Sequence, residues 1–90
     1  MTLTNEVAVE MAYVKISKIR TKVLKTLYNE VKMPVQISKD TDILMNRVSV
    51  TLSQLRERDL VVCLNPEARK GRLYRLTETG VQVAEYLMEN

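Results

Sequence analysis

The sequence predicts a mainly α-helical domain with one small β-hairpin. Apolar residues recur at helical spacing over most of the chain, and two short aliphatic runs lie between residues 60 and 76. The only prolines, Pro34 and Pro66, fall at junctions between these segments. At 90 residues, 46% hydrophobic and 28% charged, the chain has the length and composition of one globular domain over residues 1–90, and it is too apolar for a disordered chain.

An N-terminal helix over residues 1–15 is expected to begin near Thr4 or Asn5. Four apolar residues within it recur every three or four positions, which places them on one helical face. They are Leu3, Val7, Met11 and Val14. Such a stripe requires a partner surface.

A second helix is expected from Ser17, a possible N-cap. Whether it continues the first helix stays open. Pro34 restricts Met33 to extended geometry, so we expect this helix to end near Val31 and a short extended segment to follow. The apolar residues expected on one side of the helix are Ile16, Ile19, Val23, Leu27 and Val31.

A short helix over 36–41 and a polar turn over 41–44 precede a third main helix over about 44–58. Its core face is expected to carry Val48, Leu52 and Leu55. At about 100° per residue, the opposite face is centred on Asn46, Val50, Ser53 and Glu57, with Arg47 and Gln54 on one flank and Ser49 and Arg56 on the other.

The helical period is lost after Asp59, where a β-branched apolar run over 60–64 and a second short apolar run over 73–76 predict a hairpin. The loop between them, 65–72, is polar and becomes basic toward its end. Thr77 is then expected to cap a C-terminal helix within 78–90. Its apolar stripe consists of Val81, Ala84, Leu87 and Met88.

This order of elements is the one that a winged helix-turn-helix requires, and three motifs match a known family. They are Ser17-Lys-Ile-Arg, Asn46-Arg-Val-Ser, and the stretch Asn65-Pro-Glu-Ala-Arg-Lys-Gly-Arg-Leu-Tyr-Arg-Leu-Thr that leads to Gly80. From Ser17 to about Val83 the chain resembles small archaeal-type winged-helix transcriptional regulators with an ArsR/MarR-like DNA-binding domain. The last motif is the most specific of the three. The corresponding core covers residues 17–77.

The resemblance implies a double-stranded DNA partner. The third main helix would enter the major groove, and the hairpin loop, the wing, would lie on the backbone or minor groove. The resemblance places Asn46, Arg47, Ser49, Val50 and Ser53 near bases, and Arg69, Lys70 and Arg72 near phosphates.

Charge placement independently favours a polyanionic partner, although the formal net charge is only +3. No acid occurs between Ile43 and Arg56, where phosphates would repel carboxylates, and Val50 could contact a thymine methyl group. Residues 69–75 are also free of acids. The acid-free stretch 11–29 could contact flanking phosphates or form a solvated helix face; its cations are Lys15, Lys18, Arg20, Lys22 and Lys25.

The apolar stripes of the two terminal helices exceed what a small winged helix needs to cover its core. We therefore predict a two-fold homodimer that uses Leu3, Val7, Met11, Val81, Ala84, Leu87 and Met88. The alternative is that the N-terminal helix folds back over its own domain. A dimer would present two recognition helices to half-sites about one DNA turn apart.

Several functional classes are disfavoured by composition. With no His and a single cysteine, Cys63, the chain lacks the means for ArsR-type metal sites or a Ser/His or Cys/His nucleophile, so we expect no metal, no cofactor and no enzyme. The two glycines, Gly71 and Gly80, do not form a phosphate-binding loop. Cys63 is expected to be a small buried hydrophobe. No signal peptide or membrane span is indicated, which favours a cytoplasmic protein with no membrane partner.

Two alternatives keep the same fold. A winged helix can serve as a protein–protein interaction module, and a positive surface can serve a sequence-neutral architectural protein of chromatin. One departure from the family is Asp59, where such sequences usually have glycine. Asp59 must either adopt the left-handed conformation of a helix C-cap, at some cost, or end the helix differently.

Overall fold

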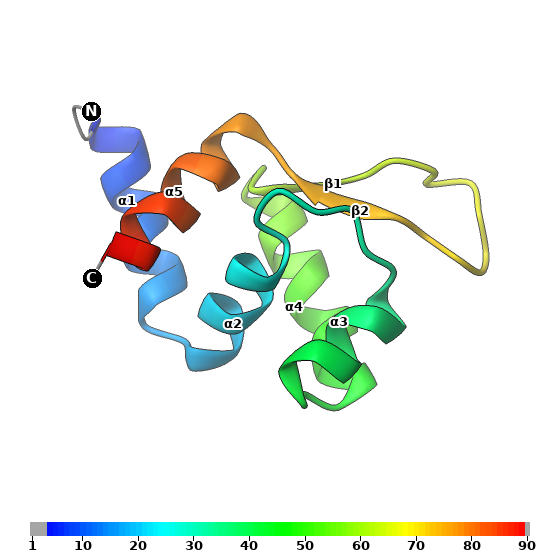
Figure 1. Cartoon of the computed structure of the whole chain (residues 1–90). Coiled ribbons are helices and arrows are strands. Elements are labelled where there is room, and N and C mark those ends of the chain that lie inside the picture. The colour runs from blue at the N-terminus through cyan, green and yellow to red at the C-terminus, as the bar shows by residue number, and fades with distance from the viewer. Residues whose placement is uncertain (1–3, 90) are drawn as a thin grey trace.

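The computed structural model describes residues 4–89 and confirms a mainly helical architecture with one antiparallel hairpin (Figure 1). In chain order the elements are α1 (Asn5–Lys15), α2 (Lys18–Thr26), α3 (Pro34–Thr41), α4 (Met45–Glu57), β1 (Val61–Cys63), β2 (Tyr74–Leu76) and α5 (Glu78–Glu89).

Side-chain caps begin three of the helices at the predicted positions. Thr4 Oγ1 accepts a hydrogen bond from Val7 N–H at 3.2 Å, and Ser17 Oγ accepts one from Arg20 N–H at 3.2 Å. At the start of α5, Thr77 Oγ1 accepts one from Gly80 N–H at 3.0 Å. Because Ser17 is extended at φ −122° and ψ 120°, α1 and α2 are separate helices.

The end of α2 differs from the prediction. The helix ends at Thr26 rather than near Val31, because Asn29 takes the left-handed conformation at φ 58° and turns the chain. Asn tolerates this conformation better than most residues. The predicted apolar stripe is therefore correct in its middle, where Val23 and Leu27 are buried, and wrong at its ends, where Ile16 is 81% exposed and Val31 48% exposed.

The segment after α2 is extended as expected and joins the hairpin. Met33 has ψ 155°, in keeping with the restriction imposed by Pro34. Lys32 N–H donates to Tyr74 O at 3.0 Å and Tyr74 N–H donates to Lys32 O at 2.9 Å. Lys32 thus forms an isolated antiparallel β-bridge with β2. On its other side β2 pairs with β1, with Tyr74 opposite Cys63.

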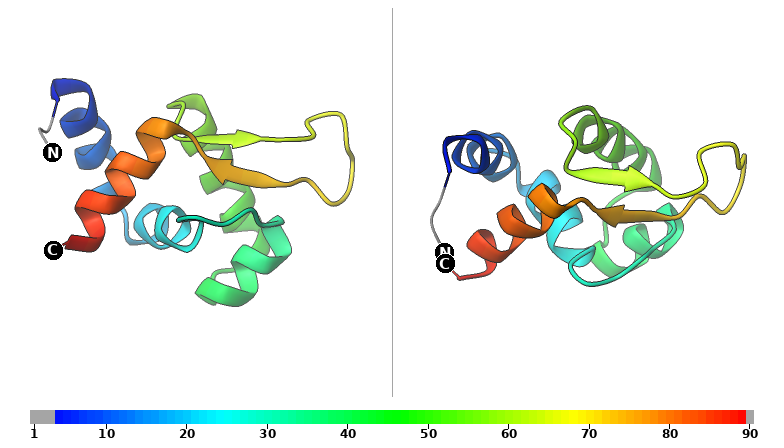
Figure 2. Two further views of the ribbon diagram at one scale, coloured as in Figure 1. Left: turned by 45° about the horizontal axis from the view of Figure 1, so that its top comes forward. Right: turned by 90° about the horizontal axis from the view of Figure 1, so that it is seen from above.

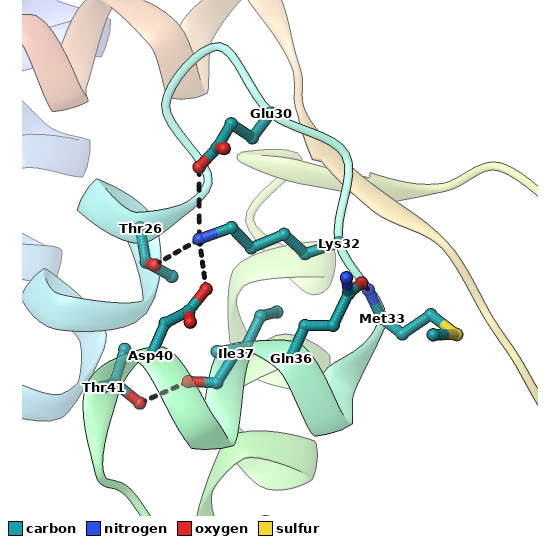
Figure 3. A network of polar contacts seen from close by, with 8 residues as sticks. All are labelled: Thr26, Glu30, Lys32, Met33, Gln36, Ile37, Asp40 and Thr41. Atoms are coloured by element: carbon teal, nitrogen blue, oxygen red, sulfur yellow. Dashed lines mark hydrogen bonds and ion pairs between the residues drawn. The ribbon is translucent and has the colours of Figure 1, made fainter.

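The Lys32 side chain joins three consecutive segments (Figure 3). It is only 9% exposed, and its Nζ donates to Thr26 Oγ1 at 2.8 Å and Asp40 Oδ2 at 2.7 Å and lies 3.1 Å from Glu30 Oε2. Burial lowers the pKa of Lys32, but the hydrogen bonds to Asp40 and Glu30 outweigh it, so the pKa lies above its ordinary value. The ammonium therefore ties the end of α2 and the following loop to α3.

One aliphatic core holds the helices together, with α2 near the centre of the body and the hairpin loop projecting from it (Figure 2). α1 and α5 pack side by side at the end of the molecule opposite that loop. The largest fully buried side chains of the core are Val14, Val23, Leu24, Leu27, Ile37, Val48, Leu52, Leu55, Leu60, Val61 and Val83.

α4 ends by the first of the two alternatives left open for Asp59. Asp59 is left-handed at φ 59°. Leu60 N–H donates to Leu55 O at 2.9 Å and Asp59 N–H to Arg56 O at 3.0 Å, the two bonds of a Schellman motif. Glycine carries no Cβ penalty in this conformation.

We therefore expect Asp59→Gly to stabilise the protein by about 1 kcal/mol. Thermal melting of the two proteins under identical conditions measures this gain. An unchanged or lower Tm for the glycine variant would contradict the proposed strain at Asp59.

Candidate nucleic-acid interface

The outer face of α4 is open to solvent. All five residues predicted to lie near bases are exposed, while Val48, Leu52 and Leu55 on the opposite face are buried. Val50 is 58% exposed and lies among polar neighbours. The predicted orientation of the helix is therefore confirmed; contact with bases stays a prediction. The five exposed residues are Asn46, Arg47, Ser49, Val50 and Ser53.

A tight turn between α3 and α4 holds this face in place. Asp42 ends α3 in the left-handed conformation at φ 60°. Ser38 Oγ donates to Ile43 O at 2.5 Å, and Thr41 Oγ1 donates to Ile37 O at 2.6 Å. With Ile37 and Ile43 buried, the two helices form a helix-turn-helix unit whose second helix presents its outer face.

A groove of about 430 Å³ runs between α4 and the N-terminal end of α2. Arg20 is fixed at its edge, since Nε donates to Gln54 Oε1 at 3.2 Å and Nη1 to Tyr13 O at 3.0 Å. The guanidinium also lies 3.9 Å from the centroid of the Tyr13 ring. The groove is lined by Ile16, Ser17, Ile19, Arg20, Asn46, Arg47, Val50, Thr51 and Gln54.

The sequence did not single out Arg20, Gln54 or Ile16 as residues of this site. Arg20 and Gln54 are 34 positions apart, and only the packing of α2 on α4 brings them together. Ile16 was expected on the apolar side of α2, but it lies before the N-cap Ser17 and forms the C-cap of α1, so the spacing of α2 does not govern its orientation. Together with Val50 it gives the groove two exposed apolar side chains.

The Asn65 side chain forms hydrogen bonds across the hairpin loop. Its Oδ1 accepts from Leu73 N–H at 2.8 Å, its Nδ2 donates to Gly71 O at 3.1 Å, and the backbone carbonyl of Asn65 accepts from Ala68 N–H at 3.0 Å. Leu64 N–H donates to Leu73 O at 2.8 Å, which extends the pairing beyond the strands. The Asn65 side chain thus ties the two ends of the loop 65–72 together.

The three cations of this loop differ in their surroundings. Arg69 and Lys70 are exposed, and neither forms a hydrogen bond or ion pair with residues 4–89. Arg72 is half-buried and its Nε donates to Ala68 O at 2.7 Å. A guanidinium has further N–H groups, so Arg72 can brace the loop and still face a phosphate.

The resemblance drawn from the sequence implies that this loop contacts DNA. On that expectation, Asn65→Ala should weaken DNA binding several-fold by loosening the loop, with an unchanged salt dependence because no charge is lost. Affinity for a duplex measured over a salt series tests both parts. A changed slope, or an affinity equal to that of the unsubstituted protein, would contradict the role of Asn65.

The residues predicted to form a dimer surface lie mainly inside the chain. α1 packs against α5, so that Val7, Ala84 and Leu87 are buried, while Met11 and Val81 are half-buried against the core. The alternative, in which the N-terminal helix covers its own domain, is thus correct. Of the predicted set, Met88 is 51% exposed and Leu3 lies outside the described residues. The homodimer itself stays a prediction.

Comparison with known proteins shows which fold this is. No protein-family model matches the chain, and no curated protein is significantly similar to it. Among solved structures, the apo form of a double mutant of Lactococcus lactis ZitR superposes with a TM-score of 0.72 at 21% identity, over 99% of this chain and 72% of that one. A second structure of the mutant gives 0.70 at 22% identity, over 81% of this chain and 51% of that one.

The chain has a winged helix-turn-helix fold. In this fold α4 occupies the position of the helix called the recognition helix, and the loop 65–72 occupies the position called the wing. ZitR is a bacterial protein, so the similarity does not support the archaeal type of the resemblance.

Neither a metal-ligand cluster nor a membrane-spanning helix occurs in the described part of the chain. Within residues 4–89, no three His, Cys, Asp or Glu side chains are grouped so that they could hold a metal ion. Cys63 is buried as predicted, at the base of the wing with its Sγ 3.8 Å from Asn65 Oδ1. No helix in the described part of the chain is long and apolar enough to cross a membrane.

Proposed function

We propose that this protein is a transcriptional regulator that binds double-stranded DNA, with α4 in the major groove and the wing on the backbone or minor groove. The observation that carries the proposal is the exposed outer face of α4, which has no acid before its last residue, Glu57, and lies beside a groove edged by Arg20 and Arg47. Phosphates repel carboxylates, and no acid occurs from Ile43 to Arg56.

In this proposal the side chains on the outer face of α4 contact the bases. Asn and Arg match the edges of adenine and guanine in the major groove, and serine hydroxyl groups can meet either. Val50 and Ile16 supply apolar surface for thymine methyl groups. Arg69 and Lys70 anchor the wing to phosphates, which makes much of the affinity electrostatic.

Selection from a pool of randomised duplexes tests sequence recognition. A regulator enriches a defined site, and Asn46→Ala or Val50→Ala then weakens binding to that site by about 1 to 3 kcal/mol. The loss should vanish on a duplex altered at the contacted base pair. Gln82→Ala on α5 is the control and should bind like the unsubstituted protein.

Two other results would redirect the proposal. Binding without any enriched site, unaffected by Asn46→Ala and Val50→Ala, would indicate a sequence-neutral architectural protein. An absence of DNA binding would favour a protein-docking module, for which the exposed Ile16 and Val50 would be contact residues.

A further inference from the structure

A second basic surface lies on the other side of α2. Four lysines form this surface, which we call the lysine face. All four are exposed, and none forms an ion pair or hydrogen bond with residues 4–89. They surround a hollow of about 410 Å³ whose lining includes Thr21 and Leu87 and no acid. The lysine face consists of Lys15, Lys18, Lys22 and Lys25.

The charges of Lys18 and Lys22 are unfavourable for α2. Lys18 is its first residue, at the positive end of the helix dipole, and the first turn contains no acid. Lys18 and Lys22 are spaced i,i+4 and Lys22 and Lys25 i,i+3, so the like charges of each pair repel one another along the helix. A bound polyanion would offset this repulsion. Contacts within the free protein do not offset it, so a polyanionic ligand explains why the lysines are placed together.

The lysine face points away from the recognition helix. At about 100° per residue, Lys18, Lys22 and Lys25 lie within about 60° of one another around α2. Arg20 lies on roughly the opposite side and bonds Gln54 of α4. Leu87, which borders the hollow of the lysine face, belongs to α5. A straight duplex seated on α4 would therefore leave the lysine face free.

We propose that the lysine face binds the phosphate backbone of a second duplex segment, so that the protein bridges two segments of DNA. This inference rests on the proposed function for the first duplex. From Lys18 to Lys25 the helix rises about 10 Å, which is the axial length of about three phosphates along one DNA strand. An extended row of unpaired ammonium groups fits a repeating polyanion.

Energy transfer between two short duplexes, one with a donor and one with an acceptor dye, tests bridging. Each duplex should be about one and a half helical turns long and carry the same sequence. The unsubstituted protein should produce transfer, and the Lys18→Gln/Lys22→Gln/Lys25→Gln variant should need at least about tenfold more protein to do so. Its affinity for a single labelled duplex, measured by anisotropy, should change less than about twofold. The Arg69→Ala/Lys70→Ala variant should instead lose single-duplex affinity.

Each outcome decides for or against bridging. Transfer that persists in the triple lysine variant would overturn the inference and assign bridging to another surface, such as two recognition helices of a dimer. The unsubstituted protein could instead show no transfer, while its affinity grows with duplex length only when the lysines are present. This result would contradict bridging and would show that the lysines contact flanking DNA of the same duplex. Failure of the unsubstituted protein to bind any single duplex would refute the proposed function itself.

Discussion

Gly80→Ala is expected to unfold the protein or to destabilise it by about 3 kcal/mol or more. Gly80 lies in the first turn of α5, where the helix crosses the chain just before β1. A Cβ at this position would overlap the carbonyl oxygen of Leu60 and lie 3.1 Å from the carbonyl carbon. It would also lie 3.3 Å from Leu76 Cβ. Backbone atoms cannot rotate away, so α5 would have to move off the hairpin.

Helix propensity predicts the opposite sign, since alanine is favoured over glycine in a helix by about 1 kcal/mol. The steric cost exceeds this gain, so denaturant unfolding should show a large net loss. Gly71→Ala is the matched control. Its φ of 68° imposes strain, but the nearest atom to its added Cβ is Met33 Sδ at 3.9 Å, so the cost should stay near 1 kcal/mol. A stable Gly80→Ala protein would show that α5 does not pack closely on Leu60.

The double variant Arg69→Ala/Lys70→Ala should weaken DNA binding about 30-fold at low salt, if each exposed phosphate contact contributes about 1 kcal/mol. The fold should remain intact because neither side chain bonds residues 4–89. Two lost contacts should also make the slope of log affinity against log salt shallower by about 1.8. Anisotropy titrations at several salt concentrations measure both quantities.

A control must separate contact from total charge. Lys22→Ala/Lys25→Ala removes the same charge, lowering the formal net charge from +3 by two, but does so on the lysine face. It should leave the affinity for one duplex and its salt slope nearly unchanged. Equal losses in the two double variants would mean that the wing acts only through the overall charge of the protein.

Local signals in the sequence were sufficient to predict most elements. Thr4, Ser17 and Thr77 begin helices through their own side chains, and Asp59 ends α4 in the left-handed conformation, one of the two alternatives for that position. The end of α2 was missed because Pro34 is a stronger signal than Asn29, although Asn29 makes the turn. The pairing of Lys32 with Tyr74 depends on contacts between distant segments, which periodicity does not encode.

The site was predictable where a helix face decides it. The helical period of α4 correctly predicted that Asn46 and Val50 are exposed. The contact between Arg20 and Gln54 at the groove could not be predicted in this way, because it depends on how α2 packs on α4. An apolar stripe shows that a face is buried but not which partner buries it. For this reason the stripes of α1 and α5 predicted a dimer surface, although the two helices largely cover each other.

The central claim is that the α4 and wing surface binds duplex DNA through phosphate contacts. Fluorescence anisotropy of a labelled random-sequence duplex, titrated with the unsubstituted protein at several salt concentrations, tests it most directly. We predict binding whose log affinity falls linearly with log salt, with a slope steeper than about −1.8, because Arg69 and Lys70 alone account for two contacts. No binding at about 50 mM salt, or an affinity that does not respond to salt, would contradict the account.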